Sequence, residues 1–75
     1  MNYELDLENS FINYITQTQR KYFKIALKHT IENNLSGVKI NRITYLFDFK
    51  NNEVFIGTNC KDSNRDLQRY KLKRI

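Results

Sequence analysis

Alternating apolar residues on either side of Asn51-Asn52 constrain the fold more than any other feature of this chain. The apolar positions recur at every second residue and are Ile43, Tyr45, Phe47, Phe49, Val54 and Ile56. Because successive side chains of a strand point to opposite faces, the pattern predicts two strands that share one apolar face. Asparagine tolerates the positive φ of a tight turn, so we expect a β-hairpin over about residues 38–58.

A two-residue turn at Asn51-Asn52 would also fix the register of this hairpin. The expected cross-strand pairs are Lys50 with Glu53, Phe49 with Val54, Phe47 with Ile56 and Tyr45 with Thr58. The opposite face would carry the mixed set Arg42, Thr44, Leu46, Asp48 and Phe55. We therefore expect one face of the sheet to form the core and the other to be partly solvated.

Apolar residues recur at helical spacing between about Ser10 and Asn33. The centre of the stripe is Phe11, Ile15, Tyr22 and Ala26, widened by Ile12, Phe23 and Leu27 on one side and by Tyr14 and Ile25 on the other. Such a broad stripe indicates either one helix covered from two sides or two helices broken near residues 16–19. No glycine or proline forces a break there, so we favour one long helix, with Ser10 as its N-cap and residues 33–37 ending it.

The two ends of the chain complete the expected fold. Residues 3–7 alternate in polarity and could add an edge strand. Residues 62–75 are ambiguous, because Ser63 to Asp66 resembles a capping box while Tyr70 to Lys73 alternates; we favour a short helix with Leu67 and Tyr70 inward. The prediction is a single α+β domain over residues 1–75, with a long N-terminal helix packed on a small antiparallel sheet built around the hairpin, and a short C-terminal helix or strand.

Length and composition restrict the function classes. A chain of 75 residues has room for one core, and such a core supplies only about 3–5 kcal/mol, so a homodimer is a reasonable expectation. A single cysteine, Cys60, excludes an internal disulfide and disfavours a zinc site. The sequence has no targeting signal and no long apolar run, so we expect a cytoplasmic protein that has no membrane partner and needs no cofactor.

The charge is basic and unevenly distributed. The net charge is +5 and the isoelectric point is about 9.5. Acidic residues precede position 10, whereas Arg20, Lys21, Lys24 and Lys28 occupy an arc of about 100° on the predicted helix, opposite its apolar stripe. Basic side chains at this spacing could follow a phosphate backbone or contact an acidic protein surface. A solvated outer helix face with no partner explains them as well.

The C-terminal segment contains a second basic cluster, together with a tyrosine. Its basic residues are Lys61, Arg65, Arg69, Lys71, Lys73 and Arg74, and Tyr70 lies among them. In a helix, Arg65, Arg69 and Lys73 would share one edge and could grip phosphates or carboxylates. A solvated chain end fits equally well. On the hairpin, Phe55 falls on the second face, where it could meet a partner or a second copy.

Catalytic and metal-binding groupings are not predicted. His29 is the only histidine and lies near the end of the helix, where it would stabilise the helix dipole. Cys60 has no recognisable base to activate it as a nucleophile. We therefore assign no catalytic residue and no metal ligand from the sequence.

The order strand, helix, hairpin loosely resembles small bacterial toxins that cleave messenger RNA on the ribosome without a metal. The residues that carry this resemblance are Arg42 to Tyr45 with Asp48, then Val54 to Ile56, with Lys61, Arg65 and Tyr70 downstream. The resemblance implies an endoribonuclease whose basic and tyrosine residues come from that downstream set. The sequence predicts no separate strand between helix and hairpin, which such toxins would have.

Three hypotheses follow from the sequence. The leading one is a small non-enzymatic basic protein that binds nucleic acid, or a regulator associated with nucleic acid. The alternative is an inhibitor of the kind phages make against a host defence or nucleic-acid enzyme, resembling an anti-CRISPR protein and acting by protein-protein binding. The third is the metal-independent endoribonuclease.

Overall fold

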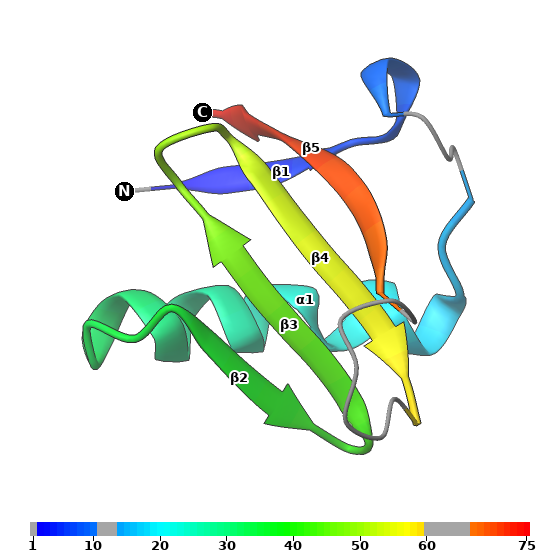
Figure 1. Ribbon diagram of the computed structural model, residues 1–75, viewed down its shortest axis with the longest axis vertical. Helices are drawn as coiled ribbons and strands as arrows, with labels where there is room; N and C mark the ends of the chain where they lie inside the picture. The colour runs from blue at the N-terminus through cyan, green and yellow to red at the C-terminus, as the bar shows by residue number, and fades with distance from the viewer. Residues whose placement is uncertain (1, 11–13, 60–66) are drawn as a thin grey trace.

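The computed structural model describes residues 2–10, 14–59 and 67–75, which form one helix and a five-stranded antiparallel sheet (Figure 1). The elements are β1 (Tyr3–Asp6), a 3-10 turn η1 (Leu7–Asn9), α1 (Gln17–Glu32), β2 (Gly37–Ile40), β3 (Ile43–Asp48), β4 (Glu53–Thr58) and β5 (Gln68–Arg74). The strand order is β1-β5-β4-β3-β2, so β5 lies between the first strand and the central hairpin. The predicted α+β class is confirmed.

Helix α1 begins at Gln17, seven residues after the predicted N-cap Ser10. Thr16 is the N-cap: its hydroxyl accepts a hydrogen bond from the backbone N–H of Gln19, and the Gln19 side chain accepts one from the backbone N–H of Thr16. This capping box satisfies two backbone donors at the helix start, which is why the chain turns helical at this point. The last helical residue is Glu32 and Asn33 is the C-cap, in agreement with the predicted end at residues 33–37.

The later start also changes which face of the helix is buried. Phe23, Ala26 and Leu27 are buried, whereas Tyr22 is half-buried and Ile25 is 53% exposed. The predicted stripe was centred on Ile15 and on Phe11; Ile15 precedes the helix, and Phe11 lies outside the described residues. The prediction of one long helix with a very broad apolar stripe is therefore wrong in two respects. The helix is shorter than predicted, and its buried side is rotated about the helix axis relative to the centre of the predicted stripe.

The hairpin of β3 and β4 has the predicted faces but a different register. Tyr45 pairs with Ile56 and Phe47 with Val54, two residues away from the expected pairing. The connection is a four-residue loop, residues 49–52, because the Asp48 carboxylate accepts hydrogen bonds from the backbone N–H and the side-chain amide of Asn51. These bonds hold the pKa of Asp48 below its usual value. A shift of two residues in the register leaves every side chain on its predicted face, because side chains of a strand alternate between faces with a period of two.

Three further strands complete the sheet. The predicted N-terminal edge strand is confirmed as β1. Strand β2 pairs with β3 and is the separate strand between helix and hairpin that the sequence did not predict. Of the two predictions for the C-terminal segment, the favoured helix is wrong and the strand is confirmed: residues 68–74 form β5, which pairs with β1 on one side and β4 on the other. The apparent capping box lies outside the described residues. Hydrogen bonding along both edges outweighs a local helical preference.

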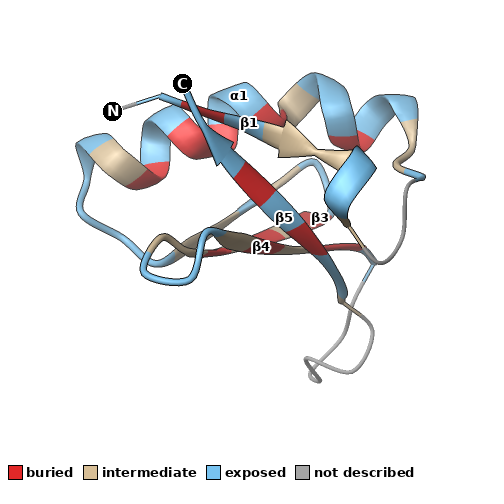
Figure 2. Ribbon diagram, turned by 90° about the horizontal axis from the view of Figure 1, so that it is seen from above, coloured by how far each residue is buried: buried red, intermediate tan, exposed pale blue. Residues whose placement is uncertain are grey.

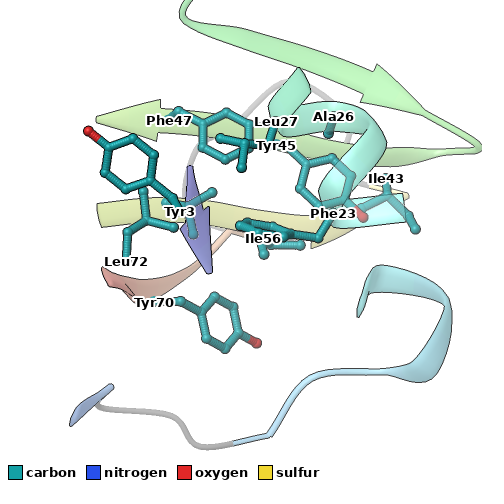
Figure 3. Packing of buried hydrophobic residues seen from close by; sticks show 11 residues of the cluster. Tyr3, Phe23, Ala26, Leu27, Ile43, Tyr45, Phe47, Ile56, Tyr70 and Leu72 are labelled. Carbon is teal, nitrogen blue, oxygen red and sulfur yellow. The ribbon is translucent and has the colours of Figure 1, made fainter. Parts of the chain in front are cut away.

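The core lies between α1 and the concave face of the sheet. Figure 2 shows β3 and β4 in one layer and α1 in another, with β5 crossing steeply so that β1 reaches the level of the helix. Phe23 from the helix packs against Tyr45 and Phe47, with ring centroids 6.5 and 5.8 Å apart (Figure 3). Tyr70 and Leu72 extend the same core from β5. Burying these residues turns the opposite side of α1 outward.

Gly37 is required by the close contact between β2 and β3. A Cβ at this position would overlap the Leu46 side chain and lie 2.8 Å from the carbonyl oxygen of Tyr45. We expect Gly37→Ala to destabilise the protein by about 1–3 kcal/mol, because β2 must move away from β3. Urea denaturation would measure the change, with Lys39→Ala, an exposed site on the same strand, as the control. Equal unfolding midpoints for the two variants would contradict the expected clash.

Candidate binding surfaces

The basic residues of α1 form one exposed surface, which we call the helix surface: Arg20, Lys21, Lys24 and Lys28. Their positions follow from the packing of Phe23, Ala26 and Leu27, which fixes the opposite side of the helix against the sheet. The predicted exposure of all four side chains is confirmed. Together they place four positive charges within nine residues, or about 12 Å along the helix axis.

Within the part of the chain that the structure describes, little of this surface is neutralised by carboxylates. Among the described residues only Glu32 forms an ion pair with it, at 3.9 Å from Lys28, and both side chains are largely exposed. An exposed pair of this length contributes little stability, so Lys28 can exchange it for another anion. The Lys21 ammonium lies 5.6 Å from the centre of the Tyr22 ring. The helix surface is thus mostly uncompensated.

A groove of about 560 Å³ runs beside the helix surface, between α1 and the ends of β1 and β5. The residues that line it are Asn2, Tyr3, Lys24, Leu27, Lys28, Ile31, Glu32 and Ile75. Leu27 and Tyr3 are buried and form its floor, whereas Lys24, Lys28 and Glu32 are exposed and form part of its rim. Figure 2 shows the chain ends close to the helix on this side. The groove therefore combines an apolar floor with a mainly cationic rim.

The basic residues of the C-terminal segment lie elsewhere. As strand residues, Arg69, Lys71 and Lys73 alternate with buried Tyr70 and Leu72, so they project from the face of the sheet that α1 does not cover. The predicted edge of Arg65, Arg69 and Lys73 does not form, because residues 69 and 73 belong to a strand; Arg65 and Lys61 lie outside the described residues. Arg74 is exposed and pairs with Tyr3 of β1.

Acidic residues balance the charge on this outer sheet face. The Glu53 carboxylate lies 3.5 Å from Arg69 and 3.3 Å from Lys71. In the strand register, Glu4 lies opposite Lys73 and Asp6 opposite Lys71. A polyanion would have to displace these carboxylates. The outer sheet face is thus a weaker candidate for nucleic acid than the helix surface.

Tyr70 is unavailable as a surface residue, which corrects its assignment to a partner interface. Its side chain is 3% exposed, and its hydroxyl donates a hydrogen bond to the carbonyl oxygen of Tyr14 at 2.8 Å. Burial raises the pKa of Tyr70, with a smaller contribution from the neighbouring Tyr14. Tyr70 is therefore part of the core of the fold.

Phe55 does lie on the outer sheet face, half-buried and directly opposite Leu46. Leu46 and Leu67 join it in lining a hollow of about 310 Å³. Leu46 was predicted on this face, but its pairing with Phe55 was missed because the expected register was two residues off. The groove beside α1 was also missed, since it depends on Tyr3 and Ile75 meeting residues of the helix.

The remaining chemistry-bearing residues that the structure describes form no recognisable site, and Cys60 lies outside the described residues. The side-chain amide of Asn33 lies 3.3 Å from Nδ1 of His29 and donates a hydrogen bond to the His29 carbonyl oxygen at 2.9 Å. Within residues 2–10, 14–59 and 67–75, no three His, Cys, Asp or Glu residues gather as a metal site would require. In the same ranges α1 is too short and too polar to span a membrane. Comparison with protein-family models, curated proteins and solved structures finds no match to this chain.

Proposed function

We propose that this protein is a non-catalytic nucleic-acid-binding protein, and that it binds through the helix surface. The observation that carries the proposal is the exposure of Arg20, Lys21, Lys24 and Lys28 on one side of α1, with one long ion pair to Glu32 among the described residues. Backbone phosphates are the ligand that fits a row of uncompensated cations.

The spacing of these side chains suits a strand of phosphates. Arg20 and Lys28 are separated by about 12 Å along the helix, while one strand of a duplex advances about 3.4 Å per phosphate. Three or four phosphates can therefore lie within reach of the surface. Each neutralised phosphate releases a counterion, so the binding energy is mainly electrostatic and depends weakly on sequence.

Salt titration of oligonucleotide binding tests this proposal. We expect the logarithm of the binding constant to fall linearly with the logarithm of the salt concentration, with a slope of about −0.7 to −0.9 for each engaged cation. Lys24→Gln should weaken binding and reduce the steepness of this slope by nearly one unit. Combining Arg20→Gln, Lys21→Gln and Lys24→Gln should lower affinity at least tenfold at moderate salt. Fluorescence anisotropy with a labelled oligonucleotide would measure both quantities.

Lys50 provides a matched control for Lys24. It is an exposed lysine in the loop between β3 and β4, outside the helix surface, and Lys50→Gln removes the same charge. We expect its affinity and its salt slope to equal those of the unmodified protein. The proposal is wrong if Lys24→Gln and Lys50→Gln have the same effect, or if no oligonucleotide binds at low salt.

A second candidate function is the protein inhibitor, and the outer sheet face favours it. There Glu53 contacts both Arg69 and Lys71, and Glu4 and Asp6 of β1 add two further carboxylates. Phe55 and Leu46 form an apolar centre. Balanced charge around an apolar centre is typical of protein interfaces. Failure to bind any oligonucleotide at low salt would support this candidate over the first. The endoribonuclease loses one of its assigned residues, because Tyr70 is buried.

A further inference from the structure

We propose that the groove beside α1 is a binding site for unpaired bases, so that the protein prefers single-stranded nucleic acid over a duplex. This inference rests on the proposed function and adds to it the form of nucleic acid that is recognised. Lys24 and Lys28 carry it, because they belong both to the helix surface and to the rim of the groove. A strand whose phosphates lie on these two lysines is placed beside the apolar floor.

The apolar side chains that line the groove suit a nucleic-acid base. Leu27 and Ile31 of α1 lie on one side, and Tyr3 and Ile75, from the ends of β1 and β5, line the rest. Their apolar side chains can cover the faces of a planar aromatic ring, which gains stability from leaving water. Contacts of this kind do not distinguish one base from another, consistent with binding that depends weakly on sequence.

The groove is also large enough to hold a base. A volume of about 560 Å³ is within the range of small-molecule pockets in proteins, roughly 300–1,000 Å³. Residue 31 follows Lys28 by three positions and Lys24 by seven, so at 100° per residue the three side chains lie within an arc of about 60° on α1. A base over Ile31 would therefore keep its own phosphate close to both ammonium groups.

A duplex cannot use the groove in the same way. Its bases are paired and stacked, and bringing one out costs a few kcal/mol. A duplex would meet the helix surface through its phosphates alone, whereas a single strand can also bury one face of a base, roughly 60 Å² of apolar surface worth about 1.5 kcal/mol. The structure thus points to a preference of at least tenfold for a single strand.

Glu32 has the one acidic side chain among the residues that line the groove, and it does not block it. Its carboxylate lies 3.9 Å from Lys28, and its side chain is 59% exposed. A phosphate that approached Lys28 would replace this contact at little cost, because the exposed pair is already screened by water. Glu32 would also disfavour a second phosphate at the same end of the groove.

Three oligodeoxynucleotides of equal length separate base contacts from phosphate contacts: a thymidine strand, the same strand with abasic sites, and a duplex. We expect the thymidine strand to bind at least tenfold more tightly than the abasic strand, which keeps the phosphates and lacks the bases. The inference is overturned if thymidine and abasic strands bind with equal affinity. If none of the three binds, the proposed function itself fails, so the two failures are distinguishable.

Substitutions of two isoleucines of α1 test whether the bases bind in this groove. Ile31→Gln changes the groove, and Ile25→Gln changes a side chain that is 53% exposed and does not line the groove. We expect Ile31→Gln to reduce the preference for the thymidine strand over the abasic strand at least threefold, without weakening the abasic strand. Ile25→Gln should leave the preference unchanged. Circular dichroism would check that both variants are folded. Equal effects of the two substitutions on the preference would contradict the location of the base-binding site in the groove.

Discussion

Replacing Phe23 with alanine is expected to unfold most of the protein at room temperature. Phe23 is 4% exposed and is the side chain of α1 that contacts the rings of Tyr45 and Phe47. Removing a buried phenylalanine ring costs about 3–5 kcal/mol, through lost burial and the cavity that remains. A single core in a chain of this length supplies roughly the same amount. The loss of α1 from the sheet should therefore be nearly complete.

The measurement is urea denaturation followed by far-ultraviolet circular dichroism. Ile25→Ala is the matched control, because Ile25 lies two residues away on the same helix and is 53% exposed. We expect Ile25→Ala to change the free energy of unfolding by no more than about 0.5 kcal/mol. A folded Phe23→Ala variant with the same midpoint as Ile25→Ala would show that α1 is not held by this contact.

The same contact determines the function that we propose. A helix that turns Phe23, Ala26 and Leu27 toward the sheet must turn Lys24 and Lys28 away from it, because the helical repeat fixes the angle between them. The basic surface is therefore as well defined as the core beneath it. Its cations are exposed because the apolar residues of the same helix are buried.

The parts of the fold that follow from local periodicity could be predicted from the sequence. The core face of the hairpin was predicted correctly although its register was wrong, because a slip of two residues returns Tyr45 and Phe47 to the same side. The exposure of the helix surface was predicted for the same reason, since the helical repeat turns Lys24 and Lys28 away from the centre of the buried stripe of α1.

The parts that depend on distant residues could not be predicted. The alternation of Tyr70 to Lys73 is a local sign of a strand, but nothing local indicates that residues 68–74 pair between β1 and β4, and that pairing decides between strand and helix. The helix start was misplaced because Ile15 continues the apolar spacing of the helix, whereas the capping box of Thr16 and Gln19 begins it. The groove forms because Tyr3 and Ile75 lie beside Ile31, and a local sequence pattern cannot predict a contact between residues so far apart in the chain.

Alkaline pH is expected to destabilise the protein through Tyr45. This side chain is fully buried, and its hydroxyl donates a 2.6 Å hydrogen bond to the carbonyl oxygen of Gln19 in the first turn of α1. Burial, with a smaller contribution from Tyr22, raises the pKa of Tyr45 from 10.0 to about 12. Ionisation would place a charge in the core and remove the donor that joins the helix to the sheet.

The direction of this pH effect follows from the protonation state of Tyr45 that the folded protein favours. The folded protein favours neutral Tyr45, so this contribution to stability is complete below pH 10, the pKa in the unfolded chain, and is lost as the pH rises toward about 12. A difference of about two pKa units corresponds to roughly 3 kcal/mol, a large part of the stability expected for a chain of this length. The raised pKa of Tyr70 acts in the same direction.

Tyr45→Phe isolates this effect from the other groups that titrate at high pH. At neutral pH the variant should be less stable by about 1 kcal/mol, because the Gln19 carbonyl loses its donor. Between pH 10 and 12 the unmodified protein should lose more stability than the variant, so the difference between them narrows and then reverses. Urea denaturation at several pH values would measure it. Parallel losses of stability in the two proteins would show that Tyr45 ionises as readily in the folded chain as in the unfolded one.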